Sequence, residues 1–139
     1  MDREIIGEKL EALRHCVKRL EAKCPDKIEI LQQDMDVQDI VAMNLARSVQ
    51  LCVDIAAHIV AESEAPAPAT MAEAFATLQT LGVLTDDVAM RMRRAVGFRN
   101  IAVHAYEKID WAVVHDVCRN RLDDLEKFAK EIQRLLDTA

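Results

Sequence analysis

The sequence predicts an all-α protein, an antiparallel bundle of four or five helices. Only three glycines and three prolines occur among its 139 residues, too few for an all-β sandwich or barrel, which turns every 8–12 residues or so. Apolar residues recur every three or four positions, and no segment alternates with a period of two. Hydrophobic residues make up 51% of the chain and charged residues 30%, as in a folded domain rather than a disordered one. We therefore expect a single domain over residues 1–139.

The first predicted helix runs from Asp2 to about Ala22, and Pro25 ends it or begins the next piece. Its apolar positions form one stripe, with spacings of three and four residues: Ile6, Leu10, Leu13, Val17 and Leu20. In residues 26–36, acids interrupt a few apolar positions, so we expect a short helix or a turn there.

The second long helix is predicted over residues 38–62. Its apolar positions fall on one arc: Val41, Leu45, Val49, Cys52, Ala56, Ile59 and Val60. Polar side chains fall on the opposite arc, about 80° wide: Asn44, Arg47, Asp54 and His58. The proline- and alanine-rich residues 64–69 are too short to separate two domains, so they predict a loop between helices.

Two shorter helices are marked by capping residues. Thr70 followed by Glu73 is a capping box, which predicts a helix from there to about Thr80, with Gly82 as its stop. Thr85, followed by two aspartates, caps another helix, which is predicted to continue to about His104.

A final long helix is predicted after Asp110, which serves as its cap. Its apolar residues keep a heptad-like spacing: Trp111, Cys118, Leu122, Leu125, Ala129, Ile132 and Leu136. This pattern favours one continuous helix packed along another.

Charge is distributed unevenly along the chain. The formal net charge is −6, which argues against a general nucleic-acid binder because phosphate contacts need Lys and Arg. Residues 88–108 nevertheless carry +4, which leaves −10 on the remainder, and the local sign matters more to a ligand than the total. Arg91, Arg93 and Arg94 are the candidate contacts to a phosphate backbone, although a solvated basic face explains them nearly as well.

Nothing in the sequence points to a membrane, a metal or a cofactor. The apolar runs fall short of the roughly 18 residues that span a bilayer, and the N-terminus lacks the order of a signal peptide, so we expect a cytoplasmic protein. The four cysteines form no C-x-x-C pair and have no zinc-ligand spacing with histidine, which predicts reduced, packed thiols.

The segment Arg99-Asn100-Ile-Ala-Val-His104-Ala-Tyr106 gathers a cation, an amide, an imidazole and a phenol. The planar Arg99 guanidinium suits a phosphodiester, and His104 titrates near neutral pH. The pair could cleave RNA without metal: His104 takes the proton of a ribose 2′-OH, and Arg99 stabilises the charge that builds on the phosphoryl oxygens.

Geometry and simpler explanations limit this hypothesis. Positions five apart on a helix point about 140° apart, so Arg99 and His104 converge only if the helix ends or distorts, or if two copies form one cleft. The residues also have structural explanations: Arg99 and His104 as a structural pair, Asn100 as a helix cap, Tyr106 as a half-buried aromatic, and Asp54 as part of a solvated helix face.

The pattern R-N-x-x-x-H-x-Y, followed by Ile109-Asp110 and a long final helix, resembles the HEPN superfamily, and within it the HepT-type toxins. The resemblance covers nearly the whole chain, with Ala105 standing where glycine is common. It implies a metal-independent endoribonuclease toxin of a HEPN/MNT (type VII-like) toxin–antitoxin pair, with its cleft at a homodimer interface. Arg99 and His104 would then be catalytic and Asn100 and Asp54 supporting. Tyr106 would be the residue that a nucleotidyltransferase antitoxin modifies with AMP.

Two other classes of protein remain open from the sequence. One is a non-catalytic helical partner, or substrate-binding subunit, of a nucleotidyltransferase, which would not need the Arg/His pair. The other is a plain helical dimerisation module, which would leave the motif unexplained. The intact motif favours the nuclease, and a short nucleotidyltransferase reading frame beside the gene would discriminate best.

Overall fold

The computed structural model describes residues 2–104 and 109–138, with side chains for all of these except 101–104. Within these residues it contains helices and no strand, which confirms the all-α class. The helices number seven in the described part, more than the four or five expected: α1 (Arg3–Lys23), α2 (Ile28–Gln33), α3 (Met35–Ala61), α4 (Met71–Thr80), α5 (Asp86–His104), α6 (Trp111–Asn120) and α7 (Leu122–Thr138).

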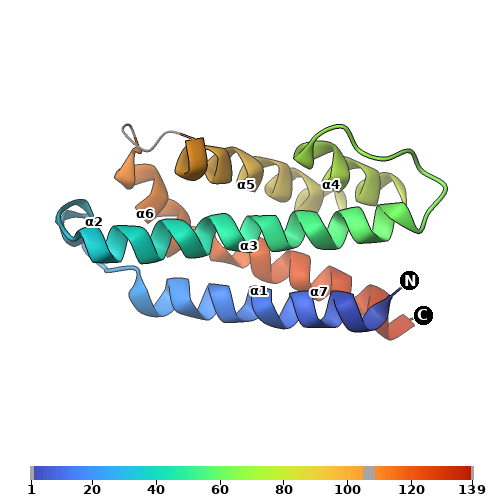
Figure 1. The fold of residues 1–139 in the computed structure, drawn as a ribbon, viewed down its shortest axis with the longest axis horizontal. Coiled ribbons are helices and arrows are strands. Elements are labelled where there is room, and N and C mark those ends of the chain that lie inside the picture. Colours follow the sequence, from blue (N-terminus) through green and yellow to red (C-terminus); the bar gives the residue numbers. More distant parts are fainter. Residues whose placement is uncertain (1, 105–108, 139) are drawn as a thin grey trace.

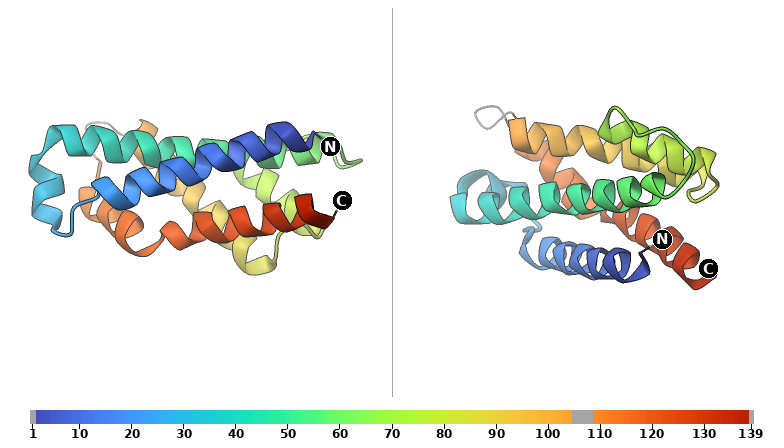
Figure 2. Two further views of the ribbon diagram at one scale, coloured as in Figure 1. Left: turned by 90° about the horizontal axis from the view of Figure 1, so that it is seen from below. Right: turned by 45° about the vertical axis from the view of Figure 1, so that its right-hand side comes forward.

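The long helices run up and down around a central α3 (Figure 1). Helix α1 packs antiparallel to α3 on one side, whereas α4 and α5 pack against its other side. Helix α7 contacts α1, α3 and α5, so it closes the bundle from behind, as the turned views show (Figure 2). The short helices α2 and α6 contact each other at the end of the bundle opposite the termini.

Helix α3 owes its apolar composition to its place in the core. Among the described residues it is the one helix long and apolar enough to cross a bilayer. Its apolar arc is buried inside the bundle, with Val41, Val49 and Ala56 at most 1% exposed. Phe75 of α4 and Phe128 of α7 meet edge to face, with ring centroids 5.8 Å apart. The hydrophobicity of α3 therefore serves helix packing.

The predicted Thr70 cap is present, and Asp2, where the first helix was predicted to begin, is the cap of α1. Asp2 accepts from the Ile5 amide at 3.2 Å, and Thr70 accepts from the Glu73 amide at 3.1 Å. The Glu73 carboxylate reaches back to the amide of Ala69, one residue before the capping threonine, at 2.7 Å. Gly82 ends α4 with a φ of 79°, a left-handed conformation that glycine adopts without a Cβ penalty. Thr70 and Gly82, which the sequence analysis identified as cap and stop, thus determine where α4 begins and ends.

Residues 26–36 and the start of the second long helix differ in detail from the prediction. The short helix α2 lies within 26–36, as one of the two alternatives expected. Helix α3 begins at Met35, three residues before the predicted start at 38. The cause is Asp34, whose carboxylate accepts from the amides of Asp36 and Val37 at 3.0 and 3.2 Å.

The predicted final helix is two helices, α6 and α7, so Asp110 caps α6 and not the last helix of the chain. Arg121 interrupts the helix with φ −128° and ψ 9°. At this break the Arg121 guanidinium lies over the Phe98 ring of α5, 5.8 Å from its centroid. Heptad spacing continues across the break because both segments keep their apolar side chains buried against the same core.

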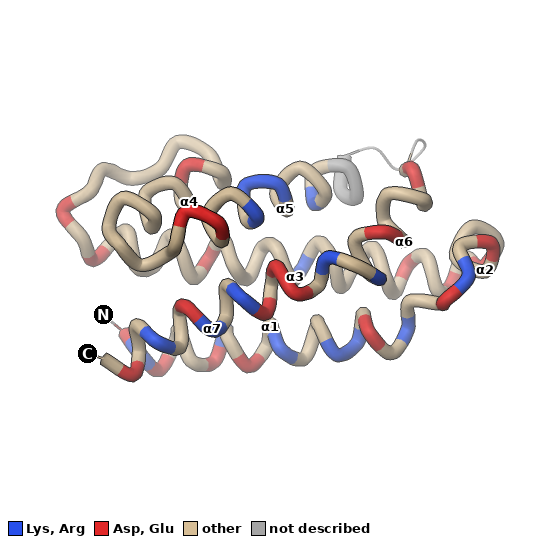
Figure 3. Tube along the Cα trace, turned by 180° about the vertical axis from the view of Figure 1, so that it is seen from behind, with Lys and Arg blue, Asp and Glu red and all other residues tan. Residues whose placement is uncertain are grey.

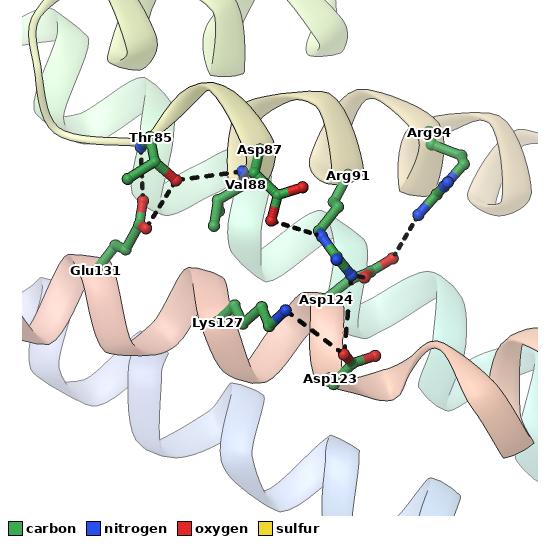
Figure 4. A network of polar contacts seen from close by, with 9 residues as sticks. All are labelled: Thr85, Asp87, Val88, Arg91, Arg94, Asp123, Asp124, Lys127 and Glu131. Atoms are coloured by element: carbon green, nitrogen blue, oxygen red, sulfur yellow. Dashed lines mark hydrogen bonds and ion pairs between the residues drawn. The ribbon is translucent and has the colours of Figure 1, made fainter.

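The break places Asp124, in the first turn of α7, against α5 (Figure 4). Asp124 is 4% exposed. Its carboxylate accepts from Arg91 at 2.6 Å and from Arg94 at 3.4 Å. The hydrogen bond to Asp124, and to a smaller extent the one to Asp87, raises the pKa of the Arg91 guanidinium. Further along α7, Glu131 binds the backbone amide and the hydroxyl of Thr85, at 2.7 and 3.0 Å.

We expect Asp124→Asn to destabilise the fold far more than Asp123→Asn. Asparagine removes the charge from a buried acceptor of two arginines, which costs about 2 kcal/mol. Asp123 is its matched control, because this neighbouring carboxylate is 53% exposed and lies 3.8 Å from Arg91, so its loss costs less than about 0.5 kcal/mol. Urea denaturation of both variants measures the difference. Equal stabilities would show that Asp124 does not hold α7 to α5.

All four cysteines are free and buried, which agrees with the predicted packed thiols. Burial raises the pKa of the Cys24 and Cys52 thiols, because a buried site disfavours the thiolate. These two thiols therefore stay protonated, and the four buried cysteines serve as small core side chains.

Candidate active site

Arg99 is half-buried because it continues the apolar stripe of α5. It follows Met92 by seven residues and Val96 by three, and both of these side chains are buried. On a helix these spacings share a face, so the Arg99 side chain is directed toward the bundle, where α5 packs on α3. A permanent cation thus lies at the boundary of the core.

The guanidinium of Arg99 has two hydrogen-bond partners among the described side chains. Its Nη2 donates to Gln50 Oε1 on α3 at 3.2 Å, and its Nη1 donates weakly to Asn100 Oδ1 at 3.4 Å. Its Nε is buried and has no partner in the described part of the chain. Both partners are neutral amides, so they orient the guanidinium without cancelling its charge.

Gln50 links Arg99 to Asp54, one of the predicted supporting residues. Gln50 Nε2 donates to Asp54 Oδ1 at 2.9 Å. Lys9 on α1 lies 3.8 Å from the other Asp54 oxygen, with the two side chains 31% and 41% exposed. The polar side chains therefore run in the order Lys9, Asp54, Gln50, Arg99 across three helices. The structure brings Asp54 and Arg99 together, but only through Gln50.

Gln50 is the site residue that the sequence reasoning missed. It lies four residues before Asp54, about 40° beyond the edge of the polar arc, so its place beside the polar face of α3 was visible in the sequence. A glutamine on a helix is usually a solvent-exposed residue without a specific role. Only the packing of α5 on α3, which brings Arg99 to Gln50, distinguishes it from such residues.

The three arginines predicted to contact RNA have different surroundings. Arg91 and Arg94 are paired with Asp124, and this basic stretch of α5 lies near the acids at the start of α7 (Figure 3). Arg93 is exposed and has no ion pair among the described residues. Arg91 and Arg94 thus contribute to the α5–α7 contact, and RNA binding by all three stays a prediction.

Two of the predicted site residues fall at the limit of the described chain. Helix α5 remains helical as far as His104, so the helix does not end between Arg99 and His104. The His104 side chain and the whole of Tyr106 lie outside the described residues. Within the residues that are described, no group of three or more His, Cys, Asp or Glu side chains is placed to hold a metal ion.

An up-and-down helical bundle with an R-N-x-x-x-H motif at the end of one helix defines a class of ribonuclease. The family model described as "Ribonuclease HepT-like" matches residues 9–132, and this chain belongs to that family. Over 130 residues the chain is 32% identical to the mRNA nuclease HepT of Shewanella oneidensis, covering 94% of this chain and 97% of that protein.

Solved structures agree with this assignment. The tri-AMPylated HEPN toxin of Shewanella oneidensis, solved in complex with its MNT antitoxin, superimposes with a TM-score of 0.87 at 30% identity, covering 96% of this chain and 98% of that one. A toxin–antitoxin structure with AMP-PNP superimposes with a TM-score of 0.88 at 30% identity, covering 94% of this chain and 98% of that one. The cytosolic protein YutE of Bacillus subtilis shares the fold. It superimposes with a TM-score of 0.85 at 15% identity, covering 99% of this chain and 92% of that one.

Proposed function

We propose that this chain is the endoribonuclease toxin of a cytoplasmic toxin–antitoxin pair, and that it cleaves RNA without a metal ion. The observation that carries the proposal is the setting of Arg99. It is half-buried and held by neutral amides, so its full charge is available to a phosphate. Membership of the HepT-like ribonuclease family supports the same activity.

The proposed reaction uses Arg99 and His104. His104 takes the proton from a ribose 2′-OH, and the 2′-oxygen forms a bond to the adjacent phosphorus. The bond from phosphorus to the 5′-oxygen breaks, and that oxygen takes a proton from water, while His104 returns the proton from the 2′-OH to the solvent. Arg99 stabilises the negative charge that develops on the non-bridging oxygens. The products are a 2′,3′-cyclic phosphate and a 5′-hydroxyl.

We propose that two copies of the chain form the cleft. Because α5 is helical through both positions, the backbone does not bend to bring Arg99 and His104 of one copy together. A symmetric dimer supplies both groups from facing helices. Light scattering at micromolar concentration is expected to give the mass of a dimer, and a stable monomer would count against a shared cleft.

The partner in this proposal is a nucleotidyltransferase antitoxin that adds AMP to Tyr106. The AMPylated Shewanella toxin, which was solved with its MNT antitoxin, supports this assignment, as does the position of Tyr106 two residues after His104. An AMP group there would place a phosphate anion near Arg99 and oppose the approach of RNA.

The proposed activity is tested with purified protein and a synthetic RNA in excess EDTA. Cleavage is expected to persist, because the nucleophile and the charge stabiliser are both supplied without a metal ion. An activity that disappears in EDTA and returns with Mg²⁺ would contradict the mechanism. A protein that binds the nucleotidyltransferase but never cleaves RNA would instead be its non-catalytic partner.

A further inference from the structure

Gln50 is the one neutral side chain between two charged groups of the site. Its amide accepts from Arg99 at 3.2 Å on one side and donates to Asp54 at 2.9 Å on the other. A guanidinium only donates and a carboxylate only accepts, so the two neighbours fix which end of the amide faces which. The orientation of the Gln50 amide is thus determined by charge on both sides.

Asp54 is linked to Arg99 through Gln50, yet it does not pair with it. No ion pair joins the two side chains, both of which lie in the described part of the chain. Asp54 instead binds Gln50 and Lys9. A direct Arg–carboxylate pair is a strong, often bidentate contact that would occupy the donors a phosphate needs. The glutamine instead holds Arg99 through one hydrogen bond and leaves its charge unpaired.

From this arrangement we infer that Gln50 is a positioning residue for the ribonuclease reaction. Its side-chain carbonyl oxygen holds the Arg99 guanidinium in place. Its amide lies between this cation and the Asp54 carboxylate, and so prevents a direct ion pair. Asp54 and Lys9 in turn hold the amide in the required orientation. This inference rests on the proposed function, in which Arg99 stabilises the transition state.

The contacts of Arg99 make this role specific to Gln50. Asn100 is exposed, adjacent in sequence and 3.4 Å away, so it restrains the guanidinium only weakly. The buried Nε donor of Arg99 has no partner among the described residues. Without Gln50, the guanidinium would lose its one hydrogen bond to another helix in the described structure and would keep only the weak one to Asn100.

Gln50→Met tests the hydrogen bonds, because methionine keeps the length of the side chain and removes both polar contacts. We expect kcat for RNA cleavage to fall about 10- to 30-fold with KM changed less than about threefold, since the lost interaction acts mainly in the transition state. Gln79→Met is the matched control: Gln79 also donates to a carboxylate, Asp86, at 2.8 Å, but lies on α4. The control is expected to keep wild-type kcat.

The double variant Gln50→Glu/Asp54→Asn tests the charge. It refills the hydrogen bonds, because the new amide at position 54 donates to the new carboxylate at position 50, which accepts from Arg99. It also places a full negative charge, that of the new carboxylate, directly beside the Arg99 guanidinium. Its melting temperature is expected to stay close to that of the wild type while its kcat falls at least about 10-fold.

The outcomes separate this inference from the proposed function. A wild-type protein that does not cleave RNA overturns the function itself. If the wild type is active and Gln50→Met keeps more than half its kcat, the positioning role is wrong. If Gln50→Met does not fold, the double variant still tests the role of Gln50 in keeping a carboxylate off Arg99. Wild-type kcat in that variant overturns this role, and low kcat in a stable protein supports it.

Discussion

Arg99→Ala and His104→Ala are each expected to abolish detectable RNA cleavage and the growth inhibition that follows from it. Removing a group that stabilises developing charge costs about 100- to 1,000-fold in kcat, and removing a general base costs about 100- to 10,000-fold. Cleavage of a labelled synthetic RNA by the purified variants measures both. Because Arg99 lies at the edge of the core, its variant should lose activity with only a small change in melting temperature.

Matched controls come from the same residue types elsewhere in the chain. Arg134→Ala and His15→Ala remove an exposed arginine of α7 and an exposed histidine of α1. Both are expected to retain wild-type cleavage. Substantial activity in either the Arg99 or the His104 variant would remove that residue from the mechanism.

Tyr106→Phe is expected to leave RNA cleavage largely intact while making the toxin resistant to enzymatic neutralisation. Phenylalanine keeps the ring but lacks the hydroxyl that would accept the nucleotidyl group. With the wild-type protein, incubation with the nucleotidyltransferase, ATP and a divalent metal is expected to halt cleavage. The same incubation should leave the variant active. Mass spectrometry should find AMP on the wild-type peptide that contains Tyr106.

Two results would contradict the modification of Tyr106. One is the absence of an AMP adduct on that peptide in a sample that has lost activity. The other is normal neutralisation of Tyr106→Phe with the adduct elsewhere. Inhibition would then be explained by the antitoxin covering the cleft.

The helices and their caps were predictable because they depend on local chemistry. Thr70 and Gly82 act within a few residues of their own positions, and the structure confirms both ends of α4. The break between α6 and α7 was not predictable, because Arg121 leaves the helical conformation while the apolar spacing continues unchanged across it. A heptad pattern reports which side chains are buried, and it does not report whether the backbone between them is continuous.

The candidate site was predictable in its residue types and not in its contacts. Arg99 and Asp54 were identified from motif and helix face, and they lie near each other in the structure. Gln50 was missed because its role depends on the packing of α5 against α3. The same applies to Asp124, whose burial against Arg91 arises from a long-range contact that no local pattern encodes.

The cleavage chemistry is tested most directly with a DNA oligonucleotide that carries a single ribonucleotide, incubated with the wild-type protein in excess EDTA. Cleavage is expected only on the 3′ side of that ribonucleotide, giving one fragment that ends in a 2′,3′-cyclic phosphate and one that begins with a 5′-hydroxyl. A 2′-O-methyl group at that position is expected to stop the reaction, because it removes the nucleophile. Cleavage of the methylated strand, or a product with a 5′-phosphate, would contradict the proposed roles of Arg99 and His104.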